Sequence, residues 1–310
     1  MNTSSLHRLA HRLALPALIL LALVALVSLA WARLTAPQGE QAVTFTPARQ
    51  TCGTLDDLHY CINEPTGPSA PDRVYHLHGR GLDAEAWNDP SYFTAQVQGE
   101  WQRRGLPAPT VVTLSYGREW LLTPRGQAPR SGLLDRIGPQ LDRLDAQLDA
   151  RTGTPRRRML VGESMGGLNV LTLGLSQPGR FDRIAALCPG VYQDSPFASL
   201  GTLRAALQRT GADPKVAFGV WWLARQHVAD DAEWARTSPL ALIETLARAP
   251  RRPALYLSCG LYDRYGNFEG TQALATRAQA LGVDTEWHPL YGGHCAVDIT
   301  SLARFLAVAG

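Results

Sequence analysis

One short run constrains the fold of this 310-residue chain more than any other: Gly-Glu-Ser-Met-Gly-Gly at residues 162–167. The residues before it, 157–161, end in an apolar stretch typical of a strand, and residues 168–175 have a pattern typical of a helix. The run predicts a sharp strand-to-helix turn, where glycines remove the β-carbons that would collide with neighbouring backbone. Ser164 lies in that turn, at a helix N-terminus that favours developing negative charge, so it is a candidate nucleophile. The alternative is a tight turn with an incidental serine.

Strand-like and helical segments alternate from residue 73 to the C-terminus. This alternation predicts an α/β domain with a mostly parallel central sheet and helices on both faces. The expected strands are 73–77, 110–115, 157–161, 184–188, 254–258 and 285–289. The expected helices are 91–104, 131–151, 164–177, 268–281 and 296–308. An antiparallel pair of short strands, 42–46 and 58–63, is expected ahead of them.

Residues 191–250 interrupt this alternation. They show helical patterns without a clear strand, and their aromatic side chains include Phe197, Phe218, Trp221, Trp222 and Trp234. Long insertions between core elements often carry function, so we expect a helical cap over a ligand site. The alternative is a helical excursion packed on the edge of the sheet.

Residues 1–32 form a segment separate from the rest. Arg8 and Arg12 precede an almost wholly apolar run that ends in Ala-Trp-Ala at residues 30–32. This layout is typical of a secretory signal with a small-residue cleavage site, and the run is also just long enough to span a bilayer. We expect export with cleavage; anchoring in a membrane by the uncleaved segment is the alternative. Residues 33–310 are expected to form one α/β domain in the periplasm or outside the cell.

The charge of the chain argues against a nucleic-acid partner. The formal net charge is +3, and Arg8 and Arg12 contribute two of these charges. The folded part is therefore left with about +1 (3 − 2), too little for an electrostatic footprint on nucleic acid.

Five cysteines fit an oxidising compartment, in which disulfides persist. Cys52 and Cys61 flank a segment that can turn the chain back on itself, so they are a candidate disulfide. Cys259 and Cys295 fall beside the candidate acid and base described next, where the fold could bring them together. Cys188 ends an expected buried strand and is expected to be a small apolar filler. No cysteine or histidine spacing is that of a metal site, so no metal is expected.

A nucleophilic serine needs a general base, and the base needs a group that orients it. Asp263 and His294 each follow an expected strand, and the glycines before His294 allow its loop to return toward the serine. Both loops emerge at the edge of the sheet where open α/β folds bind ligands. The order Ser164, Asp263, His294 is also that of the triad in α/β-hydrolases. The alternatives are a turn-capping carboxylate for Asp263 and a surface histidine for His294.

Two backbone N–H groups are expected to form an oxyanion hole. One follows the nucleophile and belongs to Met165. The other belongs to the loop after an early strand, His-Gly-Arg-Gly at residues 78–81, where Arg80 is the expected donor and Gly79 the alternative.

Several of these motifs together resemble the putative-esterase branch of the α/β-hydrolases, which includes esterase D-like, feruloyl and polyhydroxyalkanoate-depolymerase-like esterases and mycolyltransferases. The resemblance rests on residues 162–167, on Gln-Pro-Gly-Arg-Phe at 177–181, on Ala-Ala-Leu-Cys-Pro-Gly at 185–190, and on the His-Gly and Gly-His turns at 78–79 and 293–294. It covers roughly residues 70–310, and Cys188 departs from the serine usual at its position. It implies the α/β-hydrolase fold and a serine-esterase triad, while branches with these motifs differ widely in their acyl and alcohol groups.

The sequence thus predicts an exported serine esterase that acts on a small-molecule ester without a cofactor. The alternatives are an acyltransferase with the same triad, a non-catalytic binding protein of the same fold, and a peptidase. Aromatic residues of the insertion, together with Tyr116, Trp120 and Tyr265, could line an apolar pocket or belong to the core. The oligomeric state is left open.

Overall fold

The computed structural model describes residues 3–34, 43–117 and 121–307. Its contacts divide the chain into two units, Met1–Ala36 and Pro37–Gly310. The first unit holds helix α1 (Thr3–Leu34). The segment Pro16–Leu34 of α1 has 19 residues and a mean hydropathy of 2.3, so it is long and apolar enough to cross a membrane, a property that a signal sequence shares.

The second unit is built on a sheet whose described strands run in the order β1-β2-β4-β3-β5-β6-β7-β8. Antiparallel pairing joins β1 to β2 and β2 to β4, and the remaining neighbours are parallel. The strands are β1 (Arg49–Leu55), β2 (Leu58–Glu64), β3 (Ser69–Leu77), β4 (Ala108–Ser115), β5 (Arg157–Glu163), β6 (Arg183–Leu187), β7 (Ala254–Gly260) and β8 (Thr285–Leu290). The mostly parallel α/β sheet expected from the sequence is therefore confirmed.

Helices cover both faces of the sheet because successive strand side chains point to opposite faces. In β5, Leu160 enters one core, and Met159 and Val161 enter the other. The Leu160 core includes residues of α3 (Leu133–Thr152), α4 (Met165–Ser176), α8 (Pro239–Ala247) and α9 (Asn267–Ala280). The opposite core includes residues of α2 (Phe93–Arg104) and α10 (Ile299–Leu306), and a short 3-10 turn, η1 (Ala86–Asn88), adds Trp87 to it.

The strand expected at 42–46 is wrong. Residues 43–46 form no strand, and the partner of β2 is β1, paired from Arg49 opposite Glu64 to Leu55 opposite Leu58. The apolar alternation at 42–46 misled the prediction, whereas β1 is a polar edge strand with most side chains exposed. Its register is fixed by the tight turn at Asp56, which has a positive φ of 55°.

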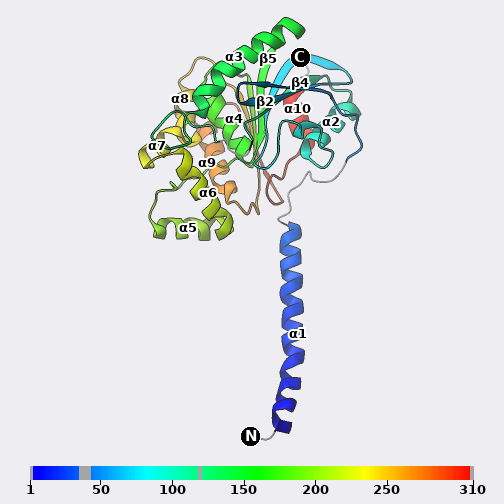
Figure 1. The fold of residues 1–310 in the computed structure, drawn as a ribbon, viewed down its shortest axis with the longest axis vertical. Helices are drawn as coiled ribbons and strands as arrows, with labels where there is room; N and C mark the ends of the chain where they lie inside the picture. The colour runs from blue at the N-terminus through cyan, green and yellow to red at the C-terminus, as the bar shows by residue number, and fades with distance from the viewer. Residues whose placement is uncertain (1–2, 35–42, 118–120, 308–310) are drawn as a thin grey trace. The chain divides into compact units, whose positions relative to one another are not determined.

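Between β6 and β7, the described chain is helical: α5 (Leu200–Thr210), α6 (Pro214–His227), α7 (Asp231–Thr237) and α8. Figure 1 shows α5 and α6 close together beyond the layer formed by α9. The last of the four, α8, packs against α4 and α9, and it buries Ile243 and Leu246 in the main core. Thus the end of this insertion belongs to the helical layer on the sheet, which leaves α5 to α7 as the part that could act as a cap.

Candidate active site

The turn around Ser164 fits only glycine at its flanking positions. Ser164 links β5 to α4 with φ 56° and ψ −117°, a strained conformation that lifts its hydroxyl away from both elements. A β-carbon on Gly166 would lie 1.8 Å from the carbonyl oxygen of Leu77, and one on Gly162 would lie 2.5 Å from the carbonyl oxygen of Gly166. Backbone occupies both places, so a larger residue would push the turn away from β3.

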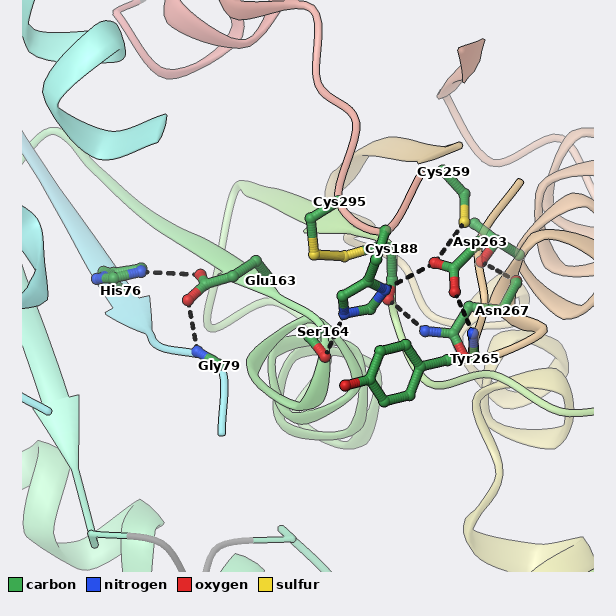
Figure 2. The surroundings of a disulfide bond; sticks show 12 residues. His76, Gly79, Glu163, Ser164, Cys188, Cys259, Asp263, Tyr265, Asn267 and Cys295 are labelled. Carbon is green, nitrogen blue, oxygen red and sulfur yellow. Dashed lines mark hydrogen bonds and ion pairs between the residues drawn. A yellow bond between two sulfur atoms is a disulfide. The ribbon is translucent and has the colours of Figure 1, made fainter. Parts of the chain in front are cut away.

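Ser164, His294 and Asp263 lie in hydrogen-bond contact, although they are far apart in the sequence. The Oγ of Ser164 is 2.9 Å from Nε2 of His294, and Nδ1 of His294 is 2.8 Å from Oδ2 of Asp263. The three residues follow β5, β8 and β7, so they meet at the carboxyl edge of the parallel strands. Figure 2 shows Ser164 and Asp263 on opposite sides of the imidazole ring to which both are hydrogen-bonded. The arrangement can move a proton from the serine to an oriented imidazole.

Asp263 is held from several sides. Its side chain is fully buried, whereas that of His294 is 12% exposed. The other carboxylate oxygen, Oδ1, accepts the backbone N–H of Tyr265 at 2.7 Å, and the thiol of Cys259 donates to Oδ2 at 3.5 Å. Burial raises the pKa of the Cys259 thiol, and the charge of Asp263 raises it further, so this cysteine stays protonated and remains a donor.

Two neighbours restrain His294. The ring of Tyr265 lies 4.2 Å from the imidazole, centroid to centroid, with a tilt of 36°. The next residue along the chain, Cys295, forms a disulfide with Cys188 just after β6 (Figure 2). The disulfide thereby ties the loop that carries His294 to the end of β6, the neighbour of β5.

This pairing differs from the cysteine arrangement expected from the sequence. Cys188 is a disulfide partner and not an apolar filler, Cys295 bonds to it, and Cys259 is the buried free thiol. The three cysteines form one small cluster, so Cys259 and Cys295 do lie close together. Which cysteine bonds to Cys295 depends on the loop conformations, which the sequence did not predict. The sulfurs of Cys188 and Cys295 lie near His294, but a disulfide offers no thiolate to a metal. Cys52 and Cys61 form the other disulfide, within the β1–β2 hairpin.

Glu163, for which no role is predicted from the sequence, ties the candidate oxyanion loop at residues 78–81 to the turn at Ser164. Its Oε1 accepts the backbone N–H of Gly79, and its Oε2 lies 3.0 Å from Nε2 of His76. Figure 2 shows Glu163 between these two residues, and its side chain is fully buried. The amide of Gly79 is therefore engaged, which leaves Arg80 and Met165 as the two candidate donors to an oxyanion. The only signal in the sequence was a carboxylate next to a buried turn.

A cavity of about 510 Å³ opens above Ser164. Its lining includes Ser164, Met165, His294, Arg80 and Gly79, together with Val216, Val220 and Leu223 of α6. Tyr265 also lines it, which is the first of the two alternatives left open for this residue.

The other aromatic residues named from the sequence lie in different environments. Tyr116 packs against the main core and donates its hydroxyl to Gln140, and it does not line the cavity; Trp120 lies outside the described residues. Trp221 and Trp234 line an adjoining hollow. Phe218 and Trp222 are about two-thirds exposed, at 65% and 64%, and Phe197 packs under the guanidinium of Arg225.

Comparison with known proteins agrees with the α/β fold described above. Residues 68–298 match a protein-family model described as "Putative esterase". No protein with curated annotation matches the chain.

Solved structures with the same architecture include several esterases. An esterase/lipase from an uncultured bacterium is 16% identical, with a TM-score of 0.59 over 91% of this chain and 96% of that chain. Carboxyl esterase 2 from the mycorrhizal fungus Tuber melanosporum is 14% identical, with a TM-score of 0.59 over 86% and 84%. Brefeldin A esterase, a bacterial homologue of human hormone-sensitive lipase, is 16% identical, with a TM-score of 0.57 over 86% and 79%. At these identities the likeness shows the fold alone.

Proposed function

The chain belongs to the putative-esterase family and is a carboxylic ester hydrolase of the α/β-hydrolase fold; from this premise we propose that it is an exported serine esterase that works through an acyl-enzyme. The observation that supports this most is the hydrogen-bonded series Ser164–His294–Asp263 at the carboxyl edge of the sheet. All three residues stand on short loops that follow strands, which is a rigid way to hold a nucleophile and its base.

In the proposed reaction, Oγ of Ser164 attacks the ester carbonyl while Nε2 of His294 accepts its proton. Asp263 holds the imidazole in the tautomer that leaves Nε2 free and stabilises the cation that forms. The amides of Met165 and Arg80 donate to the oxyanion of the tetrahedral intermediate. His294 then protonates the leaving alcohol, which leaves an acyl group on Ser164. Water then attacks this acyl-enzyme while His294 accepts its proton, and His294 returns that proton to Oγ of Ser164 as the bond to the acyl group breaks and the acid leaves.

The proposal of export is supported by the apolar helix α1 and by the two disulfides, because disulfides persist in oxidising compartments. We expect the folded unit to act in the periplasm or outside the cell, after cleavage of the first 32 residues or while it is held at the membrane by them.

Hydrolysis of p-nitrophenyl esters tests the proposal, with the Ser164→Ala variant beside the wild type. Loss of the nucleophile should lower kcat by several orders of magnitude, because the serine, base and acid act as one unit. Labelling by a fluorophosphonate should disappear in the same variant.

Ser258→Ala is the matched control. Ser258 lies in β7, and its buried hydroxyl has no hydrogen-bond partner among the described residues, so its removal should leave kcat and labelling unchanged. A wild type that folds but neither hydrolyses these esters nor reacts with fluorophosphonate would refute the esterase proposal. Products formed only with an added alcohol would indicate acyl transfer in its place.

A further inference from the structure

The cavity above Ser164 continues into a second, apolar hollow, which we call the inner chamber. Leu168, Tyr192 and Tyr265 are among the residues that line both spaces. The inner chamber is also lined by apolar side chains of α5, α6 and α7, including Leu203, Leu207, Trp221 and Trp234. An ester bound at Ser164 can therefore place one of its two parts against an apolar surface.

The inner chamber is small, at about 80 Å³. An apolar cavity of about 150 Å³ is large enough to hold one benzene molecule, so the chamber takes roughly half that bulk, a few carbons of an acyl chain. This is the bulk of a short acyl chain and too little for the long chain of a membrane lipid.

The cavity around Ser164, which we call the outer cavity, differs from the inner chamber in the charge of its lining. Three cations, Arg80, Lys215 and Arg264, are part of its lining, and no aspartate or glutamate is among the described residues that line it. Lys215 is the single lysine of a chain whose other 29 basic residues are arginines (30 − 1). All three side chains are exposed, and none of them forms an ion pair among the described residues.

Lys215 and Arg264 are brought to the same rim by the backbone. The N–H of Asp213, which caps α6, donates to the carbonyl oxygen of Arg264 at 2.8 Å, and Lys215 follows two residues later. The guanidinium of Arg264 lies 5.6 Å from the ring centroid of Tyr265, and Tyr265 in turn packs on His294. A negative group held by these cations would thus lie next to the reacting centre.

The described lining of the inner chamber does not offer a free cation. Arg209 lines it, but Arg209 is paired with both Asp194 and Glu269, at 2.6 and 2.7 Å. A carboxylate at the tip of an acyl chain would therefore meet two fixed carboxylates with one cation between them, which disfavours its binding.

We propose that the preferred substrates are esters with a short apolar acyl chain and a negatively charged alcohol part, the acyl chain in the inner chamber and the anion against Lys215 and Arg264. This inference rests on the proposed function, since it concerns the ester that Ser164 attacks. The shared chemistry is the anion, a carboxylate or phosphate on either a free small ester or a lipid headgroup.

The test compares kcat/KM of the full chain for three chromogenic probes. These are 2-nitrophenyl hexanoate, its 5-carboxylate derivative with the anion on the alcohol part, and 2-nitrophenyl hydrogen adipate with the anion on the acyl part. At low ionic strength we expect the 5-carboxylate derivative to exceed the neutral probe by about tenfold, since charged clefts raise local substrate concentration. We expect the adipate to fall below the neutral probe, and 0.5 M salt to remove most of the preference.

Variants then test whether Lys215 and Arg264 cause the preference for the anionic alcohol part. Lys215→Gln and Arg264→Gln should each lower the ratio of the 5-carboxylate derivative to the neutral probe by about threefold, and the double variant should abolish it. Arg204→Gln is the matched control, because Arg204 is an exposed cation on α5 that lines neither space. It should leave the ratio at the wild-type value.

Failure of this inference is distinguishable from failure of the esterase proposal. If the neutral probe is hydrolysed in a Ser164-dependent way but the anion gives no advantage, or if the advantage survives the double variant, the substrate inference is wrong and the esterase stands. If no probe is hydrolysed, both fail. Vesicles of dioleoylphosphatidylglycerol carry the same charge on long chains, and faster hydrolysis of these than of the soluble probes would overturn the short-chain assignment.

Discussion

Glu163 is the residue whose position most changes the interpretation of the site. It is fully buried beside Ser164 and binds both the Gly79 amide and His76, so the loop that carries Arg80 depends on it. An oxyanion donor acts only when it is aimed at the place where charge develops. In the proposed mechanism, Glu163 therefore acts as a positioning residue for the Arg80 amide and does not touch the substrate.

We predict that Glu163→Ala lowers kcat by about 10- to 100-fold with little change in KM, because loss of one oxyanion donor lowers turnover by roughly 100- to 1000-fold and here the donor is displaced, not removed. Steady-state kinetics with a p-nitrophenyl ester measures this. Glu163→Gln, whose amide oxygen can still accept from Gly79, should retain more of the activity.

Glu100→Ala provides the comparison for that prediction. Glu100 is also a buried carboxylate, but it lies on α2, where it binds Arg103, Arg104 and Thr300 away from the cavity. This change should lower the melting temperature and leave kcat intact. Equal kinetic losses in the two alanine variants would mean that Glu163 acts only through stability.

Glu163 also shows what could not be predicted from the sequence about single residues. Ser164 could be named because glycine spacing and strand-to-helix context leave few other conformations, and Asp263 and His294 because both follow strands. Glu163 carried no such pattern. Its partners, His76 in β3 and Gly79 in the loop after β3, lie more than 80 residues away in the sequence, and only the pairing of β3 with β5 brings them together.

At the scale of elements, two disulfides fasten different parts of the sheet. Cys188–Cys295 closes a separation of 107 residues and ties the His294 loop to the end of β6, whereas Cys52–Cys61 spans 9 residues within the β1–β2 hairpin. In the chain-entropy view a loop of 100 residues gains about 4.7 kcal/mol from closure and one of 15 residues about 3 kcal/mol.

We predict that the double variant Cys188→Ala/Cys295→Ala loses both stability and activity, with a melting temperature lowered by several degrees and kcat lowered several-fold as His294 gains freedom. Calorimetry and ester hydrolysis measure the two effects. Cys52→Ala/Cys61→Ala is the control, expected to lower the melting temperature less and to leave kcat unchanged. Unchanged kcat in the first variant would show that Tyr265 and Asp263 suffice to hold His294.

The elements themselves were predictable to different degrees. The central strands are short apolar runs between turn residues, so their positions follow from composition, and the alternation with helices leads to a parallel sheet. The edge strand β1 is not an apolar run, because most of its side chains are exposed, and its register with β2 follows from the tight turn at Asp56. Likewise, the role of α8 in the core could not be separated from the helical pattern of the insertion around it.

For the whole molecule, the buried carboxylate of Asp72 should link stability to pH. Burial alone would raise its pKa, but hydrogen bonds and charge from Arg157 and Arg156 outweigh this and leave the pKa below its usual value. A lowered folded-state pKa means that Asp72 contributes stability above its usual pKa near 4, and that this contribution is lost as pH falls through the folded value.

We therefore predict a melting temperature that declines from pH 5 to pH 3 more steeply in the wild type than in Asp72→Asn, which cannot titrate at this position. Differential scanning calorimetry across that range measures the two slopes. Asp57→Asn is the control, because Asp57 is about half exposed and its pairing with Arg136 is at the surface, so its slope should match the wild type. Parallel curves for all three proteins would exclude Asp72 as a source of acid sensitivity.

The number of oxidised cysteines shows whether the whole chain is exported. If α1 directs the chain out of the cytoplasm, four cysteines are oxidised and Cys259 remains the free thiol. We predict that the full-length chain, denatured without reductant and alkylated, gains one alkyl group per molecule, and that the chain lacking residues 1–32, retained in a reducing cytoplasm, gains five. Mass spectrometry counts the groups and also reads the N-terminus, which cleavage would place at Arg33.

Cys259→Ala in the full-length chain is the control and should gain no alkyl group. Five groups in the full-length chain would mean that it never reaches an oxidising compartment, and the proposal of export would then fail while the esterase proposal stood.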